Sequence, residues 1–151
     1  IPYIYPNILT KKYILIFLSM FVLASSQLAS VGAEGEFSLT SKGKISPTSH
    51  FPGLVVWNVI KNGHMQSIVQ TEDGPLKVEA TLKSSDKCEQ ENLSVCFEGE
   101  ITNVYRTNAF SQGDTYLLGI DLVNKKMYIS FTSGFFENVD ISMNLQKIVI
   151  S

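Results

Sequence analysis

The chain has 151 residues, of which 44% are hydrophobic and 17% are charged, and its formal net charge is −2. Its lysines and arginines are scattered along the chain, whereas a surface that binds phosphates or anionic lipids needs them clustered. This composition argues against nucleic acid as a partner and leaves one soluble domain as the simplest organisation.

Residues 11–33 have the order of a secretory signal peptide. Two lysines precede the apolar run Tyr13–Ala24, and Val31-Gly32-Ala33 supplies small side chains for a peptidase. We expect cleavage after Ala33, which would export the remaining chain with a net charge of −4. The alternative is an uncleaved membrane anchor, although the apolar run is short of the roughly 20 residues that span a bilayer. Residues 1–10 read as an upstream extension without a structural role.

The rest of the chain alternates with period two between turn residues and lacks helical periodicity. We therefore predict an all-β domain at residues 53–151, with seven or eight antiparallel strands in a meander barrel or a β-sandwich. Residues 34–52 are expected to be mostly irregular, because Pro47 and Pro52 interrupt pairing. The alternation at Phe37 and Leu39 allows one short strand there, followed by irregular chain at Lys42-Gly43-Lys44.

Two hairpin turns are predicted from Asn62-Gly63 and Asp73-Gly74, because such pairs favour tight turns with positive φ. A two-residue loop at the first turn pairs Trp57 with Ile68, and one at the second pairs Val69 with Val78. The two registers gather apolar side chains on one face: Val56, Ile60, Met65, Val69, Leu76, Val78, Ala80 and Leu82.

Four large apolar residues fall on the otherwise polar face of these strands, namely Val55, Trp57, Val59 and Ile68. One hypothesis is a patch that contacts a partner, since large aromatic side chains dominate interface energetics. The alternative is that residues 34–51 or a second sheet cover the four side chains, which would then form a second core layer.

Further strands are predicted by alternation in the second half of the chain. Gly99 interrupts the apolar row of the strand at residues 93–105, which indicates a bulge or close packing. A two-residue loop at Asn124-Lys125 would pair Ile120 with Ile129. The alternation of the last strand breaks at Gln146-Lys147, which we interpret as a β-bulge.

Cys88 and Cys96 are the only cysteines of the chain, and both follow the predicted leader. An exported pair in a turn-rich segment predicts a disulfide, and the spacing suits neither a redox turn nor a metal site. Asn92-Leu93-Ser94, which lies between the two cysteines, is an acceptor sequence for N-glycosylation.

Few residues of the chain are candidates for a catalytic or metal-binding site. Glu98 and Glu100 share one strand face at a spacing that paired carboxylates use in glycosidases, but a solvated strand face is the better explanation, because catalysis would need burial to raise the pKa of one carboxyl. Two isolated histidines, His50 and His64, predict neither a Ser–His–acid site nor a metal site, and no cofactor is expected.

We therefore expect an exported, non-catalytic β domain that binds a protein, a glycan or a small apolar ligand, or that forms part of the cell envelope or surface. One alternative is a small extracellular hydrolase that uses Glu98 and Glu100. Another is a carrier of an apolar small molecule inside a barrel, which requires an interior that side chains do not fill.

Overall fold

The computed structural model describes residues 37–150, and the predicted signal peptide or anchor lies outside these residues. The described part is all-β and contains no helix that could cross a membrane. Its eight strands are β1 (Leu39–Ile45), β2 (Val55–Lys61), β3 (His64–Thr71), β4 (Gly74–Ser84), β5 (Val95–Tyr105), β6 (Thr115–Asp121), β7 (Lys126–Phe131) and β8 (Asp140–Ile150).

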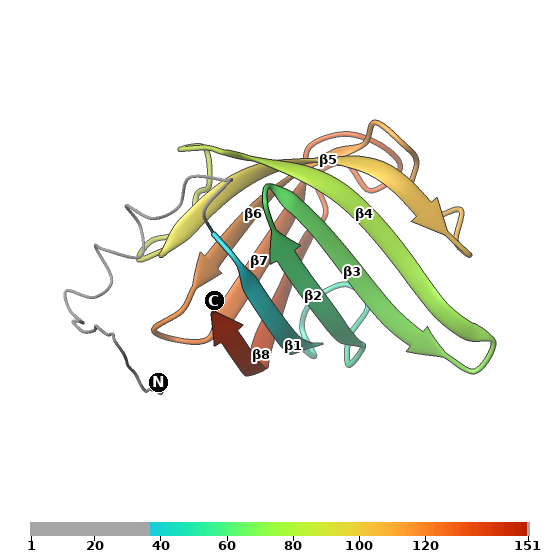
Figure 1. Ribbon diagram of the computed structural model, residues 1–151, viewed down its shortest axis with the longest axis horizontal. Coiled ribbons are helices and arrows are strands. Elements are labelled where there is room, and N and C mark those ends of the chain that lie inside the picture. Colours follow the sequence, from blue (N-terminus) through green and yellow to red (C-terminus); the bar gives the residue numbers. More distant parts are fainter. Residues whose placement is uncertain (1–36, 151) are drawn as a thin grey trace. The chain divides into compact units, whose positions relative to one another are not determined.

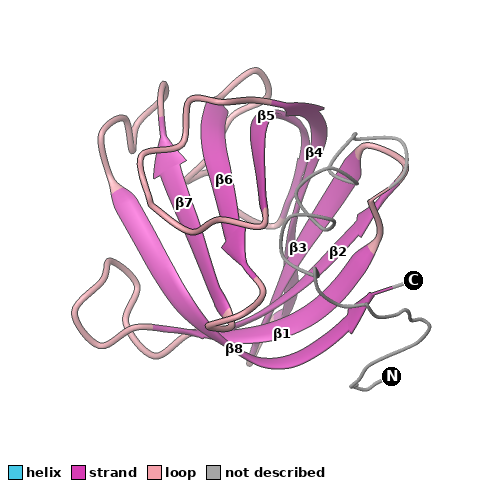
Figure 2. Ribbon diagram, turned by 90° about the vertical axis from the view of Figure 1, so that its left-hand side faces the viewer, coloured by secondary structure: helices cyan, strands magenta, loops and turns pink. Residues whose placement is uncertain are grey.

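The eight strands form one closed antiparallel barrel (Figure 1). Each strand pairs with the next one along the chain, and β8 returns to pair with β1. Figure 2 shows the strands curving around a common interior. The predicted all-β meander is thus confirmed, and of the two architectures left open by the sequence the structure is the barrel.

Strand β1 contradicts the irregular chain expected around Lys42-Gly43-Lys44. These residues pair with β2 on one side and with β8 on the other. Their pattern was hard to recognise because the inward positions of β1 include Ser41 and Gly43, which carry no large apolar side chain. The close approach of Met143 explains the glycine, since a Cβ on Gly43 would lie 2.8 Å from the Met143 sulfur.

The predicted register between β2 and β3 is confirmed, with Trp57 opposite Ile68. The predicted register between β3 and β4 is wrong by two residues, because Val69 pairs with Leu76 instead of Val78. Only Gly74 of the Asp73-Gly74 pair has a positive φ, at 110°, so the loop lies one residue earlier than a primed turn at that pair would place it. A shift of two residues keeps every side chain on its predicted face.

The hairpin between β6 and β7 shows the same kind of shift. Ile120 pairs with Met127, not with Ile129, and the loop runs over residues 122–125. The Asp121 carboxylate explains the longer loop, because it accepts hydrogen bonds from both the backbone and the side-chain nitrogen of Asn124, at 3.0 and 2.8 Å. An aspartate that binds its own turn competes with a tighter hairpin.

Two further sequence predictions are confirmed. The register between β1 and β8 shifts between Lys42 and Gly43 in a way that leaves Gln146 unpaired, as expected for a bulge at that point. Cys88 and Cys96 form a disulfide with a Cα–Cα distance of 6.1 Å. The bond ties the β4–β5 connection to the outer face of β5.

Candidate ligand-binding cavity

The two halves of the barrel interior differ. The half near the β2–β3, β4–β5 and β6–β7 turns, here called the filled end, is packed with large side chains that solvent does not reach. They include Phe37, Ile60, Met65, Phe97, Leu118, Ile120 and Met127. The other half, here called the cavity end, lies near the β1–β2, β3–β4, β5–β6 and β7–β8 connections.

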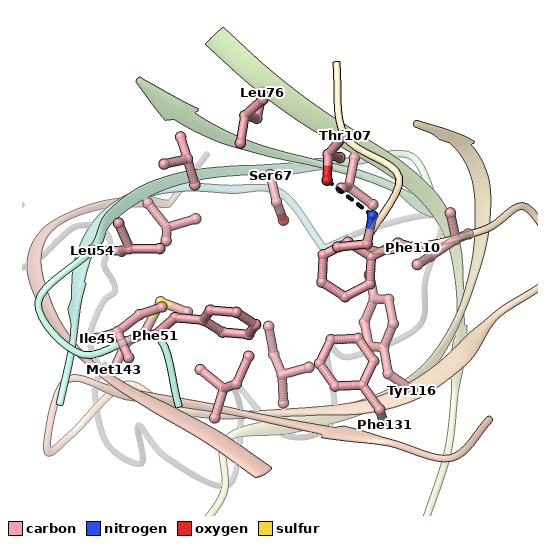
Figure 3. A pocket seen from close by; sticks show the side chains of 17 residues that line it. Ile45, Phe51, Leu54, Ser67, Leu76, Thr107, Phe110, Tyr116, Phe131 and Met143 are labelled. Carbon is pink, nitrogen blue, oxygen red and sulfur yellow. Dashed lines mark hydrogen bonds between the residues drawn. The ribbon is translucent and has the colours of Figure 1, made fainter. Parts of the chain in front are cut away.

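The cavity end contains a cavity of ≈ 230 Å³ (Figure 3). Its walls come from strand segments near these connections: Ile45, Val56, Ser67, Val69, Leu76, Val78, Ile101, Tyr116, Ile129, Phe131, Ile141 and Met143. Two connections add Phe51, Leu54, Thr107, Ala109 and Phe110. An eight-stranded barrel is just wide enough to be filled by side chains or to hold one small ligand, and this barrel is filled at one end only.

Aromatic rings from three connections meet beside the cavity. Phe51, from the β1–β2 connection, packs edge-on against Phe136 of the β7–β8 connection, with ring centroids 5.3 Å apart. Phe110 of the β5–β6 connection lies 5.3 Å from Phe136 and stacks on Phe131 at 5.3 Å. These ring contacts add to the backbone hydrogen bonds that order the same loops, such as the one that Gly53 donates to the carbonyl of Ile45. Phe51 and Phe110 line the cavity, and Phe136, which is not part of the lining, packs against both of them.

Among the residues that the structure describes, the cavity lining carries no charged side chain, and its polar side chains are Ser67, Thr107 and Tyr116. Thr107 accepts a hydrogen bond from the backbone nitrogen of Ala109 at 3.1 Å, which shapes the loop. The Tyr116 hydroxyl lies 3.6 Å from the Met65 sulfur. Burial raises the pKa of Tyr116 well above its ordinary value, so this side chain also stays neutral.

The predicted carboxylate pair lies away from this cavity. Glu98 and Glu100 are on the outer face of β5, where Glu100 is exposed and Glu98 is half-buried. Glu98 lies 4.0 Å from the Lys87 amine, as a surface ion pair. Neither carboxylate lines the cavity, so the geometry gives no support to the hydrolase hypothesis.

The four apolar residues singled out on the polar face all point outward from the barrel. Val55 is exposed, and Trp57, Val59 and Ile68 are half-buried. The Lys42 amine lies over the Trp57 ring at 5.7 Å from its centroid. No second sheet exists among residues 37–150 to cover them. A role of this patch in partner binding stays a prediction.

The predicted N-glycosylation acceptor sequence is only partly at the surface. Asn92 is exposed, whereas Ser94 of the same acceptor sequence is buried and accepts a hydrogen bond from the backbone of Leu122 at 3.0 Å. Glycosylation of Asn92 stays a prediction.

No group of three or more potential metal ligands occurs among the described residues.

The loop residues of the cavity were missed by the sequence reasoning. Phe51 and Phe110 lie in irregular segments, where period-two alternation cannot assign a side chain to a face. One available signal was the pair Ala109-Phe110 within the otherwise polar connection at residues 106–114.

Comparisons with family models, with curated proteins and with solved structures each found no match.

Proposed function

We propose that this protein is a non-catalytic binding protein that takes one small, uncharged and mainly apolar molecule into the barrel. The observation that carries the proposal is the ≈ 230 Å³ cavity, whose walls, as residues 37–150 form them, are almost entirely hydrocarbon and carry no charge. Apolar cavities of about 150 Å³ in protein cores stay dry and bind benzene. A molecule of one or two rings is therefore the appropriate size class.

The chemistry of the lining limits what such a ligand can be. Removing apolar surface from water contributes roughly 25 cal/mol per Å², so a hydrocarbon ligand gains affinity from most of its surface. An ionised group placed among these walls would lose its hydration without meeting an opposite charge, which is strongly unfavourable. The part of the ligand that lies inside the cavity is therefore uncharged.

We further propose that the domain acts after export. The Lys11–Ala33 segment, with its basic start and apolar core, supports this proposal. The disulfide between Cys88 and Cys96 adds support, because such bonds persist in oxidising compartments. Ligand capture outside the cytoplasm would need no catalytic group, which agrees with the outward position of Glu98 and Glu100.

Naphthalene is a suitable probe of the proposed function, with binding followed by calorimetry on the protein purified from a host that forms disulfides. We expect saturable binding of one molecule per chain. Val69→Phe places a ring inside the cavity and should weaken binding at least about tenfold. Val59→Phe makes the same change on the outer face of β2 and should leave binding unchanged.

Two results would contradict the proposal. One is the absence of naphthalene binding to the folded wild-type protein. The other is equal affinity of the two phenylalanine variants, which would show that the molecule binds elsewhere.

A further inference from the structure

A row of polar side chains crosses the inner wall of the barrel. Ser41 of β1 pairs in register with Asn58 of β2, and Asn58 pairs with Ser67 of β3. Ser41 and Asn58 are completely buried, and the Ser41 hydroxyl has no hydrogen-bond partner among residues 37–150. Buried polar groups are costly unless they are paired, so this row among apolar neighbours calls for an explanation.

The Asn58 amide is held in one orientation by its surroundings. Its nitrogen faces two thioether sulfurs, those of Met127 at 3.5 Å and Met143 at 3.6 Å. A thioether sulfur accepts hydrogen bonds weakly and donates none, so the amide oxygen would find no partner on that side. The oxygen therefore points to the other side, where it accepts a hydrogen bond of 2.7 Å from the Ser67 hydroxyl.

This arrangement commits the hydrogen of the Ser67 hydroxyl. With its proton donated to Asn58, Ser67 can offer only the lone pairs of its oxygen to a further partner. The Ser67 side chain lines the cavity, and its oxygen points into the space between the surrounding apolar side chains (Figure 3). Within residues 37–150 that oxygen accepts no hydrogen bond from another group.

We infer that the ligand carries one hydrogen-bond donor, a neutral hydroxyl or N–H group, which binds the Ser67 oxygen while the ring system fills the apolar cavity. This inference rests on the proposed function and names the class of its ligand. Asn58 acts through Ser67 as a positioning residue, because it fixes which way the serine hydroxyl points. Phenols, indoles and ring alcohols belong to the class, whereas ketones and ethers do not.

The test compares naphthalene with 2-naphthol, which adds one hydroxyl donor to the same ring system. The measured quantity is the affinity ratio of naphthol to naphthalene at neutral pH. We expect Ser67→Ala to lower this ratio by about 3- to 10-fold, the value of one net hydrogen bond. Val69→Ala, a change on the same strand and the same wall, should alter both affinities and leave the ratio unchanged.

A second measurement needs only the wild-type protein, because Ser67→Ala also leaves the Asn58 oxygen unpaired and could prevent folding. 2-Methoxynaphthalene keeps the ring-bound oxygen of 2-naphthol as an ether and has no donor, and 2-ethylnaphthalene corrects for the additional bulk. We expect 2-methoxynaphthalene to bind no more tightly than 2-ethylnaphthalene. We expect 2-naphthol to bind more tightly than 2-methoxynaphthalene, because only naphthol has a donor for the Ser67 oxygen.

The outcomes separate the two proposals. Two results would overturn the donor inference and leave the cavity proposal standing, provided that naphthalene binds. One is the same naphthol-to-naphthalene affinity ratio in the wild type and in Ser67→Ala. The other is an increase in affinity over naphthalene that is as large for the ether as for naphthol. If none of the probes binds to the folded protein, both are overturned.

Discussion

Gly99 of β5 lies directly beneath the ring of Tyr116. A Cβ on this glycine would lie 2.6 Å from the Tyr116 ring carbon that carries the hydroxyl, and atoms do not approach that closely. The ring cannot bend away as a flexible chain can, and its far end is buried against Met65. Gly99 is therefore required by the packing of its neighbour, as its place in an apolar row indicated.

Gly99→Ala and Gly43→Ala form a matched pair of substitutions. The ring of Tyr116 blocks the first Cβ, whereas the flexible side chain of Met143 blocks the second. We expect Gly99→Ala to lower the free energy of unfolding by about 1–3 kcal/mol, as overpacking typically does. Gly43→Ala should cost clearly less, and urea denaturation measures both. Equal losses would show that the tyrosine ring moves as easily as the methionine.

The polar residues on the inner wall show which part of the candidate site could not be predicted from the sequence. Ser41 and Asn58 occupy inward positions that binary patterning reads as errors in an apolar face. The role of Asn58 depends on side chains of β3, β7 and β8 that contact it, and no local sequence pattern contains those side chains. Such departures from the local rule are where binding sites are expected.

At the scale of elements, the β4–β5 connection and β6 support each other. Leu93 and Gln90 of this connection lie over Gly119, where an added Cβ would come within 2.8 Å of the Leu93 side chain. The disulfide holds the same connection to β5, on the outer wall and near the filled end. The bond therefore supports the barrel from outside and is separate from the cavity lining.

Replacing both cysteines by serine tests this separation. We expect the free energy of unfolding to fall by about 2–3 kcal/mol, because the open chain gains freedom when unfolded. Naphthalene affinity of the folded double variant should stay within about twofold of the wild type. A loss of affinity without a loss of stability would place the bond in the binding machinery.

The hairpins show which part of an element can be predicted from its sequence. The faces of β2, β3 and β4 were correct because side chains alternate with a period of two, which the sequence displays directly. The registers of two hairpins were wrong by two residues because Asp121 and Gly74 set loop geometry through hydrogen bonds and a single positive φ. A dipeptide preference describes the most frequent turn for that pair of residues, so it cannot give the length of one particular loop.

At the scale of the whole barrel, the close-packed core and the cavity lie in different halves. The filled end supplies the close-packed core, whereas the cavity end leaves space that a ligand would occupy. The all-β class was predictable because it follows from patterning along the chain. The cavity was not predictable, because its volume depends on how side chains from all eight strands and two loops meet.

Ile120→Ala and Ile129→Ala make the same chemical change at the two ends. Ile120 is fully buried at the filled end, so its truncation should create a new cavity and cost about 2–5 kcal/mol. Ile129 lines space that already exists, so a smaller loss of stability is expected together with altered naphthalene affinity. Thermal unfolding and calorimetry measure the two effects. A larger stability loss for Ile129→Ala would contradict the division into halves.

The pairing of β8 with β1 has a consequence for how the barrel is made. The ribosome produces seven strands before β8, and until then the sheet has two unpaired margins, each able to recruit another chain. Ile141 and Met143 of β8 join the cavity wall only when β8 pairs with β1 and closes the barrel. A nascent chain can therefore form most of its hairpins early, but its cavity is complete only once β8 is in place. The same strand pairs with both margins and so removes the hazard of aggregation.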